Sequence, residues 1–394
     1  MSNVTLSNFI LLPELKLWRA EHSQSHNYYW CGKELQTEYC PKCASPSMSV
    51  YDMRSITVKD APIRGVGVTL YITKKRYFCK KCKKPFTESI QGIRKGKRHT
   101  ERYKRAVSWA CDNFSDLTRV RRAMRCSSYF IYHSHYSQLE TKLKEKLNYP
   151  WSEKIGIDEH SFKKCRHTGR MEFASFVIDY NNERPREIVL GKTCDSLRTG
   201  LEHIPGRENV KHAVIDMCDP FKKFIREFFP NADITADKFH VLRLLSPSLL
   251  RKRKEITGTR AEAKAKRLLL MSSKKLDYAR RLALLKFLEN HPELDELYSW
   301  KERLHGFYRI KGYDRAKIAF THMTDGMAFS ERKEVKTLRR TLLKWREEIL
   351  NYFKTGLTNA RTEGFNNKAK LVKRRAYGYK SFRNYRLRVL TACF

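Results

Sequence analysis

The sequence has 394 residues, of which 41% are hydrophobic, so it is long enough for two or three domains and apolar enough to bury a core, which excludes a disordered chain. Its 81 lysines and arginines stand against 42 acidic residues and give a formal net charge of +39. Such an excess, spread along the whole length, predicts a polyanionic partner and favours nucleic acid over an anionic membrane surface. A basic solvated face, as on ribosome-associated proteins, is the alternative and also indicates nucleic acid.

The sequence also indicates the cellular compartment in which the protein is expected. No apolar run approaches the roughly 18 residues of a membrane span, and the start of the chain lacks a signal peptide. We therefore expect a soluble, intracellular protein with no membrane partner. Its eleven cysteines are then expected to be free thiols or metal ligands rather than disulfides, because the compartment is reducing.

Two Cys-x-x-Cys pairs stand near the amino terminus. Each pair fits a tight turn that directs two thiolates at one ion, so together they predict a tetrahedral structural Zn²⁺ site. Strand-like alternation between the pairs, in residues 48–54, 66–71 and 74–78, is typical of a zinc ribbon, which we place in residues 1–95. Two unrelated thiol pairs are the alternative. The candidate zinc ligands are Cys40, Cys43, Cys79 and Cys82.

Residues 96–150 are basic and have helical periodicity. Thr100 is a candidate N-cap for a first helix with Tyr103, Val107 and Ala110 on its inner face. A second helix is expected after Ser115, with Leu117, Val120 and Ala123 inward, and a third from about Tyr129. This order suggests a DNA-binding helix-turn-helix, and a plain three-helix linker is the alternative. In the third helix, the candidates for the outward face are Tyr132, His133, His135 or Tyr136.

From residue 151 the pattern changes to that of an α/β domain. Strands are expected at residues 154–159, 172–180, 185–190, 211–216 and 232–236, with helices at 196–204 and 220–229. Three strands followed by helix, strand, helix and strand is the order of a ribonuclease H-like domain. In that fold the first and fourth strands are neighbours.

Three of these predicted strands have an aspartate at or next to their end: Asp158, Asp216 and Asp237. An isolated aspartate at such a position commonly caps its own backbone. If the first and fourth strands are neighbours, however, Asp158 and Asp216 meet. Two carboxylates a few ångströms apart in a basic protein are suitable ligands for a hard divalent cation that also binds phosphate and water.

A long basic helical region follows, in residues 245–356. We interpret it as an insertion into the α/β domain, which then comprises residues 151–244 and 357–394; an independent helical domain is the alternative. The test of the insertion is whether the helix expected at residues 361–374 returns to the sheet. On that helix Glu363, Asn367 and Lys370 are spaced to share one face, although a merely solvated charged helix has the same pattern.

Four separated motifs together resemble a known family. They are Ile155-Gly-Ile-Asp-Glu, Val214-Ile-Asp-Met-Cys-Asp-Pro-Phe, Ala236-Asp-Lys-Phe-His-Val and Arg361-Thr-Glu-Gly-Phe-Asn-Asn-Lys, the last followed by Lys373-Arg-Arg-Ala-Tyr-Gly-Tyr. In this order and with these gaps they are similar to bacterial insertion-sequence transposases of the IS-L-three group. The resemblance covers nearly all of the chain, including the zinc-binding segment and the helix-turn-helix.

The resemblance implies a DDE transposase whose ribonuclease H-like core is interrupted by a long helical insertion. The catalytic and metal-binding triad carries over as Asp158, Asp216 and Glu363, with Mg²⁺ or Mn²⁺ as the ion. Asp237 and His240 stand in the third motif and are expected to support the site, as are Asn367 and Lys370. If Asp237 were the second ligand instead, Asp216 would lose that role.

The implied function is cleavage of transposon ends followed by strand transfer into target DNA. The partners are then double-stranded DNA, as transposon ends and as target, and further copies of the chain assembled on it. The expected location is the bacterial cytoplasm, with the nucleoid. Two other classes remain open: a DNA-binding regulator derived from a transposase and without catalysis, and a structure-selective nuclease that releases its product without joining it.

Overall fold

The computed structural model describes residues 12–113, 116–164, 168–258 and 263–394. These residues form two compact units, Met1–Lys144 and Glu145–Phe394. Among the residues described, no helix combines the length and the apolar character that crossing a membrane requires.

The first unit contains a five-stranded sheet in the order β1-β2-β6-β5, with β7 paired to β6. The expected stretches 66–71 and 74–78 are one long strand, and β1 and β2 were not predicted. A register shift between Leu17 and Arg19 breaks the alternation of β1, and β2 carries aromatic residues on both faces, so neither has the period of a half-buried strand. The strands are β1 (Leu15–His22), β2 (His26–Lys33), β5 (Val50–Ile63), β6 (Val66–Cys79) and β7 (Lys84–Thr87).

Three helices complete this unit: α2 (Glu101–Asn113), α3 (Leu117–Ala123) and α4 (Ser128–Lys146). Thr100 caps α2 as predicted, because its hydroxyl accepts a hydrogen bond from the Tyr103 amide at 3.0 Å. Asp116 caps α3 by accepting from the Arg119 amide at 2.8 Å, whereas Ser115 lies outside the described residues.

The inner faces of these helices confirm part of the prediction. Tyr103, Val107, Ala110 and Val120 are buried, and Leu117 is half-buried. Ala123 is exposed, however, because α3 ends there. Of the four candidates for the outward face of α4, the structure excludes two: His135 and Tyr136 are buried, and His135 Nδ1 lies 3.1 Å from the Ser108 hydroxyl of α2, so this side of the helix packs against its neighbours. Tyr132 and His133 are exposed as expected.

The second unit is built on a mixed sheet in the order β10-β9-β8-β11-β12. β8, β9 and β10 pair antiparallel, whereas β8, β11 and β12 pair parallel, so the first and fourth strands of this unit are neighbours as predicted. The strands are β8 (Lys154–Lys164), β9 (Met171–Asp179), β10 (Arg184–Leu190), β11 (His212–Ile215) and β12 (Asp233–Ala236).

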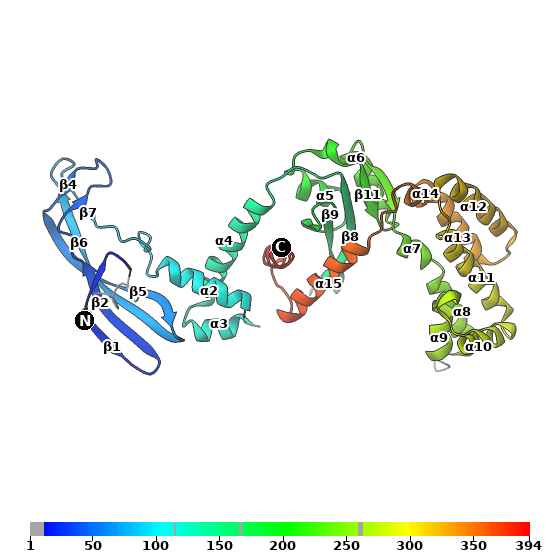
Figure 1. Ribbon diagram of the computed structural model, residues 1–394, viewed down its shortest axis with the longest axis horizontal. Helices are drawn as coiled ribbons and strands as arrows, with labels where there is room; N and C mark the ends of the chain where they lie inside the picture. The colour runs from blue at the N-terminus through cyan, green and yellow to red at the C-terminus, as the bar shows by residue number, and fades with distance from the viewer. Residues whose placement is uncertain (1–11, 114–115, 165–167, 259–262) are drawn as a thin grey trace. The chain divides into compact units, whose positions relative to one another are not determined.

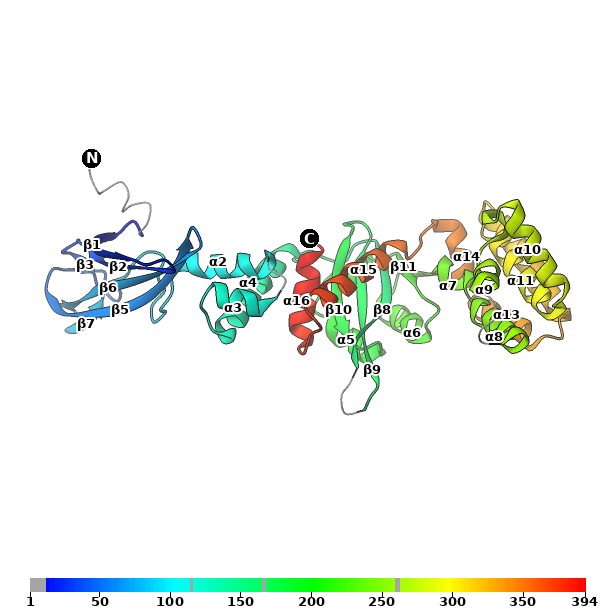
Figure 2. The same cartoon turned by 90° about the horizontal axis from the view of Figure 1, so that it is seen from below.

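Helices cover both faces of this sheet. Ile155 and Ile157 of β8 belong to the hydrophobic cluster of α5 (Cys194–Leu201) and α6 (Asp219–Phe228). The alternate residues of β8 face α15 (Ala360–Arg375) and α16 (Phe382–Ala392), which carry the chain back to the sheet. Figure 1 shows α15 crossing the sheet, and Figure 2 shows α5 and α6 on the side away from it.

The structure corrects the position of Asp158 in its strand. We expected this strand to span residues 154–159, with Asp158 near its end, but β8 continues to Lys164. The reason is that β9 pairs with β8 along this whole extension, while the parallel partner β11 pairs only as far as Ile157. Asp158 is therefore the first residue beyond the parallel pairing of β8 with β11. It lies at the carboxyl end of these parallel strands, where ligands of α/β folds commonly bind.

The segment between β12 and α15 is helical, as predicted. It shares one continuous hydrophobic cluster with the sheet and α6. Polar contacts join it to the same elements, since Lys222 of α6 lies 2.6 Å from Glu348 and Asn351 Nδ2 donates to the Ile234 carbonyl of β12 at 2.9 Å. Its helices are α7 (Lys238–Leu242), α8 (Ser246–Thr257), α9 (Ala263–Leu270), α10 (Tyr278–Glu289), α11 (Pro292–Phe307), α12 (Tyr313–Gly326), α13 (Lys333–Lys344) and α14 (Arg346–Thr355).

Candidate functional site

Four cysteine thiols converge at one end of the first unit. The Sγ atoms of Cys40, Cys43, Cys79 and Cys82 all lie within 4.8 Å of one another, and none of these cysteines forms a disulfide. Two turns bring them together. Cys40 and Cys43 follow the short strand β3 (Glu38–Tyr39), which pairs with β4 (Pro46–Ser47), and Cys79 and Cys82 lie between β6 and β7.

The two turns share a left-handed backbone conformation at the same position. The residue after each second cysteine, Ala44 and Lys83, has a positive φ of 55° and 53°, which reverses the chain and leaves both thiols pointing inward. The Cys82 amide also donates to Cys79 Sγ at 3.3 Å.

Electrostatics in this cluster favour a bound cation. Hydrogen bonds from Ser45 lower the pKa of the Cys43 thiol to about 6, while the proximity of Cys43 raises the pKa of Cys82 to about 12. Four sulfurs so close cannot all ionise unless a cation balances them. Thiolate sulfur in a four-ligand set is the donor chemistry of structural Zn²⁺, so the residues present fit that ion.

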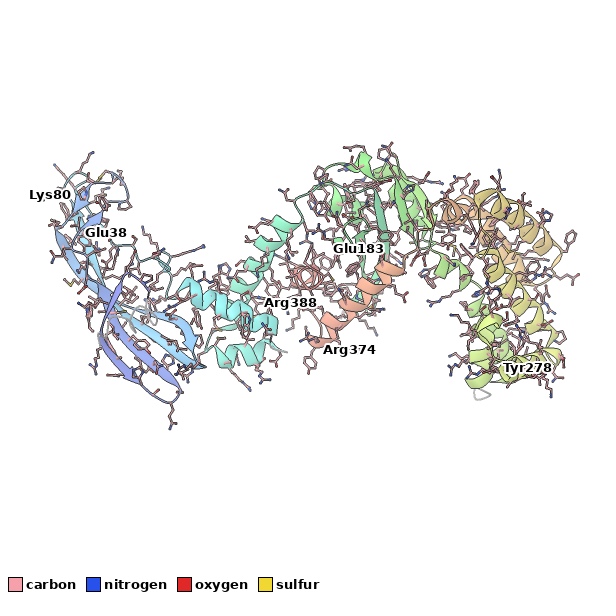
Figure 3. All side chains as sticks on the ribbon, in the orientation of Figure 1. Glu38, Lys80, Glu183, Tyr278, Arg374 and Arg388 are labelled. Carbon is pink, nitrogen blue, oxygen red and sulfur yellow. The ribbon has the colours of Figure 1, made fainter. Side chains whose placement is uncertain are left out.

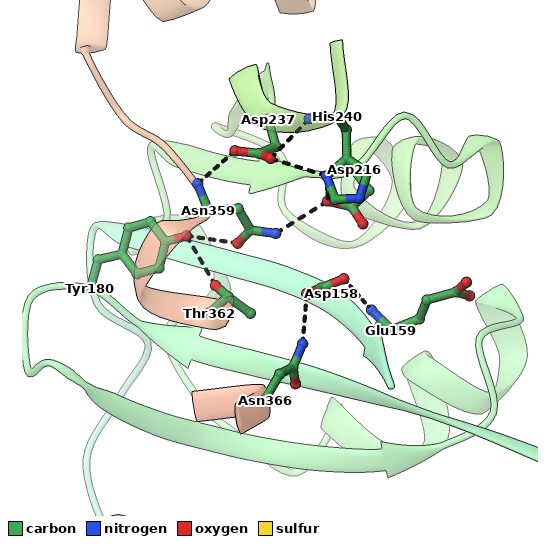
Figure 4. Close-up of polar contacts among 9 residues, drawn as sticks. All are labelled: Asp158, Glu159, Tyr180, Asp216, Asp237, His240, Asn359, Thr362 and Asn366. Carbon is green, nitrogen blue, oxygen red and sulfur yellow. Dashed lines mark hydrogen bonds and ion pairs between the residues drawn. The ribbon is translucent and has the colours of Figure 1, made fainter. Parts of the chain in front are cut away.

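The second unit brings Asp158 and Asp216 together, as the strand order predicted. Asp216 directly follows β11, beside β8. Asp158 Oδ1 accepts a hydrogen bond from the Glu159 amide at 2.7 Å, and Oδ2 accepts one from Asn366 Nδ2 of α15 at 2.6 Å (Figure 4). Burial and the neighbouring Asp216 carboxylate raise the pKa of Asp158 to about 7.

Asp237 and His240 complete the other side of this pair. His240 Nδ1 lies 2.9 Å from Asp216 Oδ1 and 3.0 Å from Asp237 Oδ2. These two hydrogen bonds raise the pKa of His240 to about 10. Asp237 is only 1% exposed and caps α7, since its side chain accepts from the His240 amide at 3.3 Å. Asp237 is thus tied into the fold, whereas Asp216 is more open to solvent.

The amino-terminal end of α15 is locked to these carboxylates by Asn359. The backbone N–H of Asn359 donates to Asp237 Oδ1 at 2.9 Å, and its side-chain Nδ2 donates to Asp216 Oδ1 at 3.3 Å. Its side-chain oxygen accepts from the Tyr180 hydroxyl at 2.9 Å, and that hydroxyl lies 3.1 Å from Thr362 Oγ1 (Figure 4). The helix expected to return to the sheet does so, through buried polar contacts.

Glycine at position 156 allows this close approach. A Cβ atom there would overlap the Tyr180 hydroxyl and lie 2.8 Å from Thr362 Oγ1. The glycine of the first motif therefore makes room for the helix that carries the last one.

Glu363 lies in the first turn of α15, as predicted, and is exposed. It stands four residues after Asn359, which contacts Asp216, and three residues before Asn366, which contacts Asp158. Residues with these spacings neighbour one another on a helix, so Glu363 lies on the exposed surface of α15 next to the residues that contact the carboxylates, and its role as a ligand stays a prediction. Asn367 and Lys370 are exposed, and their roles remain predictions.

Asn359, Asn366 and Tyr180 are the polar residues that the sequence reasoning missed. Asn366 was overlooked because its neighbour Asn367 shares a face with Glu363 at ideal spacing. Burial distinguishes the two: Thr362, Asn366 and Ala369 form the buried stripe of α15. Asn359 gave no clear signal, since it lies two residues before the predicted helix and its side chain makes no cap hydrogen bond to α15.

The chain matches known proteins in both units. Residues 155–389 match the ISL3 transposase family, and residues 36–82 match the zinc-finger of transposase IS204/IS1001/IS1096/IS1165. The chain is also similar to the transposase for insertion sequence element IS1001 from Bordetella parapertussis, with 24% identity over 367 residues that cover 90% of this chain and 88% of that protein. The first match includes all three predicted carboxylate ligands, and the second includes all four cysteines.

Proposed function

The chain belongs to the ISL3 family of transposases, and from that membership we propose that it cuts DNA at transposon ends and joins the freed ends to target DNA. The observation that carries this proposal is the meeting of the half-buried Asp158 and Asp216 at the ends of neighbouring parallel strands, with α15 returning beside them. The strand order 10-9-8-11-12, with three antiparallel and then parallel strands, supports a ribonuclease H-like core.

We assign the catalytic ligands as Asp158, Asp216 and Glu363. These residues would hold Mg²⁺ or Mn²⁺, which activates the attacking oxygen and stabilises the leaving oxygen in phosphoryl transfer. The pair fits such an ion because its oxygens are hard ligands and because two adjacent, partly buried carboxylates repel each other without a cation.

The surrounding residues hold these ligands in place. Asn366 orients Asp158, and Asn359 and His240 orient Asp216, so neither carboxylate is free to rotate. Asp237 connects His240 to the start of α15. Asn367 and Lys370, on the exposed side of the helix, are assigned to the phosphodiester backbone of the DNA.

DNA recognition is assigned to the first unit. The zinc ribbon supplies a rigid scaffold, and α2, α3 and α4 would act as a helix-turn-helix, with Tyr132 and His133 on the exposed side of the last helix. The protein would act in the bacterial cytoplasm on nucleoid DNA, as a homo-oligomer that holds two transposon ends.

One assay separates this function from its alternatives. The whole protein is incubated with Mg²⁺, a target plasmid and a duplex copied from the terminal repeat of the element. We expect nicked and joined products from the unaltered chain, and neither product from Asp158→Asn, Asp216→Asn or Glu363→Gln. Nicking without joining would indicate a nuclease, and selective binding without nicking would indicate a regulator.

A further inference from the structure

We propose that Tyr377 is a stacking residue that holds an unpaired base of the transposon end. The proposal rests on the function proposed above, in that it takes DNA as the substrate. Tyr377 lies in the short connection between α15 and α16 and is 92% exposed.

The backbone at Tyr377 is unusual for its residue type. Its φ is 53°, and the following Gly378 has a φ of 97°. The Tyr377 and Gly378 amides donate to the carbonyls of Arg374 and Lys373, at 3.1 and 3.0 Å, which closes the end of α15. Glycine or asparagine would serve this helix end at lower cost, because a bulky residue at positive φ is strained. Folding therefore does not explain the tyrosine, and a strained, exposed aromatic side chain indicates a binding role.

The two tyrosines of this connection differ in their surroundings. Tyr379 packs against the buried Tyr385 with ring centroids 5.5 Å apart, in an edge-to-face arrangement. Tyr379 thus anchors the connection, while Tyr377 is presented to solvent.

The connection is also tied to the strand that carries Asp158. The Lys373 ammonium donates to the Ser161 carbonyl of β8 at 3.1 Å. Phe162 of the same strand is buried against Phe382 and Tyr385, with ring centroids 5.5 and 5.0 Å away. The extension of β8 beyond Asp158 therefore fixes Tyr377 relative to the carboxylates.

The charges around Tyr377 identify the ligand class. Arg374, Arg375 and Lys380 are all exposed beside it, and Arg374 projects from the end of α15 in Figure 3. An aromatic ring among cations is the arrangement that binds an unpaired nucleotide, whose base stacks while its phosphates meet the charges. A peptide ligand of the same surface would need to be acidic and aromatic at once.

The helix sets the distance from the chemistry. Fourteen positions separate Glu363 from Tyr377, which is roughly 20 Å at about 1.5 Å per residue. DNA that follows α15 at about 3.4 Å per base pair would bring a base about six pairs from the cleaved bond to Tyr377. Holding that base out of the duplex would fix the end of the DNA in register with the carboxylates.

The test measures coupling between this residue and one DNA position, without any cleavage. All proteins carry Glu363→Gln, and their affinities are measured for terminal-repeat duplexes with a single mismatch moved along the end. A mismatch removes the cost of opening a base pair, so one position near the sixth pair should bind the Glu363→Gln protein more tightly than the paired duplex. In the Glu363→Gln protein, Tyr377→Ala should abolish this preference, lowering the affinity for the mismatched duplex by roughly 5- to 150-fold. Tyr377→Phe keeps an aromatic ring at this position and should keep the preference.

Tyr278→Ala is the matched control, because Tyr278 is 82% exposed on α10 of the same unit (Figure 3). It should leave the mismatch gain unchanged. An equal gain with Tyr377→Ala, no gain at any position, or an equal loss with Tyr278→Ala would overturn the inference. The binding test is independent of cleavage. If the mismatch preference depends on Tyr377 but the unaltered protein does not cut DNA, only the proposed function is contradicted. If the unaltered protein cuts DNA but the preference does not depend on Tyr377, only this inference is contradicted.

Discussion

At the scale of single residues, Asp158 links the chemistry of the site to its stability. Its pKa of about 7 exceeds the ordinary value of 3.8, so the folded protein binds this proton more tightly than the unfolded chain does. Below about pH 4 the carboxyl is protonated in both states and costs nothing. Between about pH 4 and 7 the unfolded chain is ionised while the folded protein still binds the proton, so stability falls through this window and levels off above it.

Asp158→Asn should therefore stabilise the metal-free protein increasingly as the pH rises from 5 to 8. Relieving a repulsion of about 1 kcal/mol corresponds to a gain of roughly 2–4 °C in the melting temperature. Thermal unfolding in EDTA at both pH values measures the difference between the two proteins. Asp325→Asn, at an exposed side chain outside the site, is the control. A difference that shrinks with rising pH would contradict the raised pKa.

Asp237 provides a second prediction at this scale. It holds His240 and Asn359 but is almost fully buried, so we expect it to position the site rather than to bind the ion. Asp237→Asn should lower the cleavage rate about 10- to 100-fold, the usual effect of removing a residue that supports a metal ligand. Asp216→Asn should cost several orders of magnitude more, because a ligand is lost. Single-turnover cleavage compares them, and the reverse ranking would exchange the two roles.

At the scale of secondary structure, the contact of β8 with α15 holds the start of that helix beside Asp158 and Asp216. Gly156→Ala would place a methyl group against the Tyr180 hydroxyl and Thr362, both of which are buried. Accommodating it should displace the start of α15 and destabilise the protein by about 1–3 kcal/mol. Cleavage should fall more than DNA binding does.

Gly306→Ala is the matched control for this variant. Gly306 lies within α11, and a Cβ atom there would meet no other atom within 4 Å. The change should stabilise that helix by about 0.5–1 kcal/mol, because alanine has the higher helix propensity. Denaturant unfolding compares the two, and equal effects would show that Gly156 is not a packing requirement.

The helices and strands of the second unit differ in how well the sequence alone predicts them. All five strands of the second unit and the helical segment after them were predicted, because their hydrophobic periods are intact. The end of β8 was predicted too early, at Glu159, since β9 continues to pair beyond it and the sequence of one strand does not reveal the length of its partner. The two asparagines of α15 show the same limit. Spacing selected Asn367, whereas packing against the sheet places Asn366 on Asp158.

At the scale of the whole molecule, the four cysteines and the carboxylates lie in different compact units. Cys79→Ser should release the zinc and destabilise the first unit, because three ligands do not close a structural site. The carboxylate site lies in the other unit and should keep its Mg²⁺ affinity. Elemental analysis of the purified protein and Mg²⁺ titration by calorimetry measure both. Unaltered protein without zinc, or loss of Mg²⁺ binding in Cys79→Ser, would contradict this separation.

The division into units also predicts how DNA affinity and DNA selectivity are distributed. With a net charge of +39, the whole chain should bind any duplex, and its affinity should fall steeply with salt because phosphate contacts release counterions. A fragment of residues 145–394 keeps many of these cations but lacks the zinc ribbon and the three helices. It should therefore still bind DNA, with a smaller salt dependence, and should no longer prefer the terminal-repeat duplex to a random one, since base contacts confer specificity while phosphate contacts do not. Salt titrations of both proteins on both duplexes provide the comparison. A fragment that retained the full preference would move recognition into the catalytic unit.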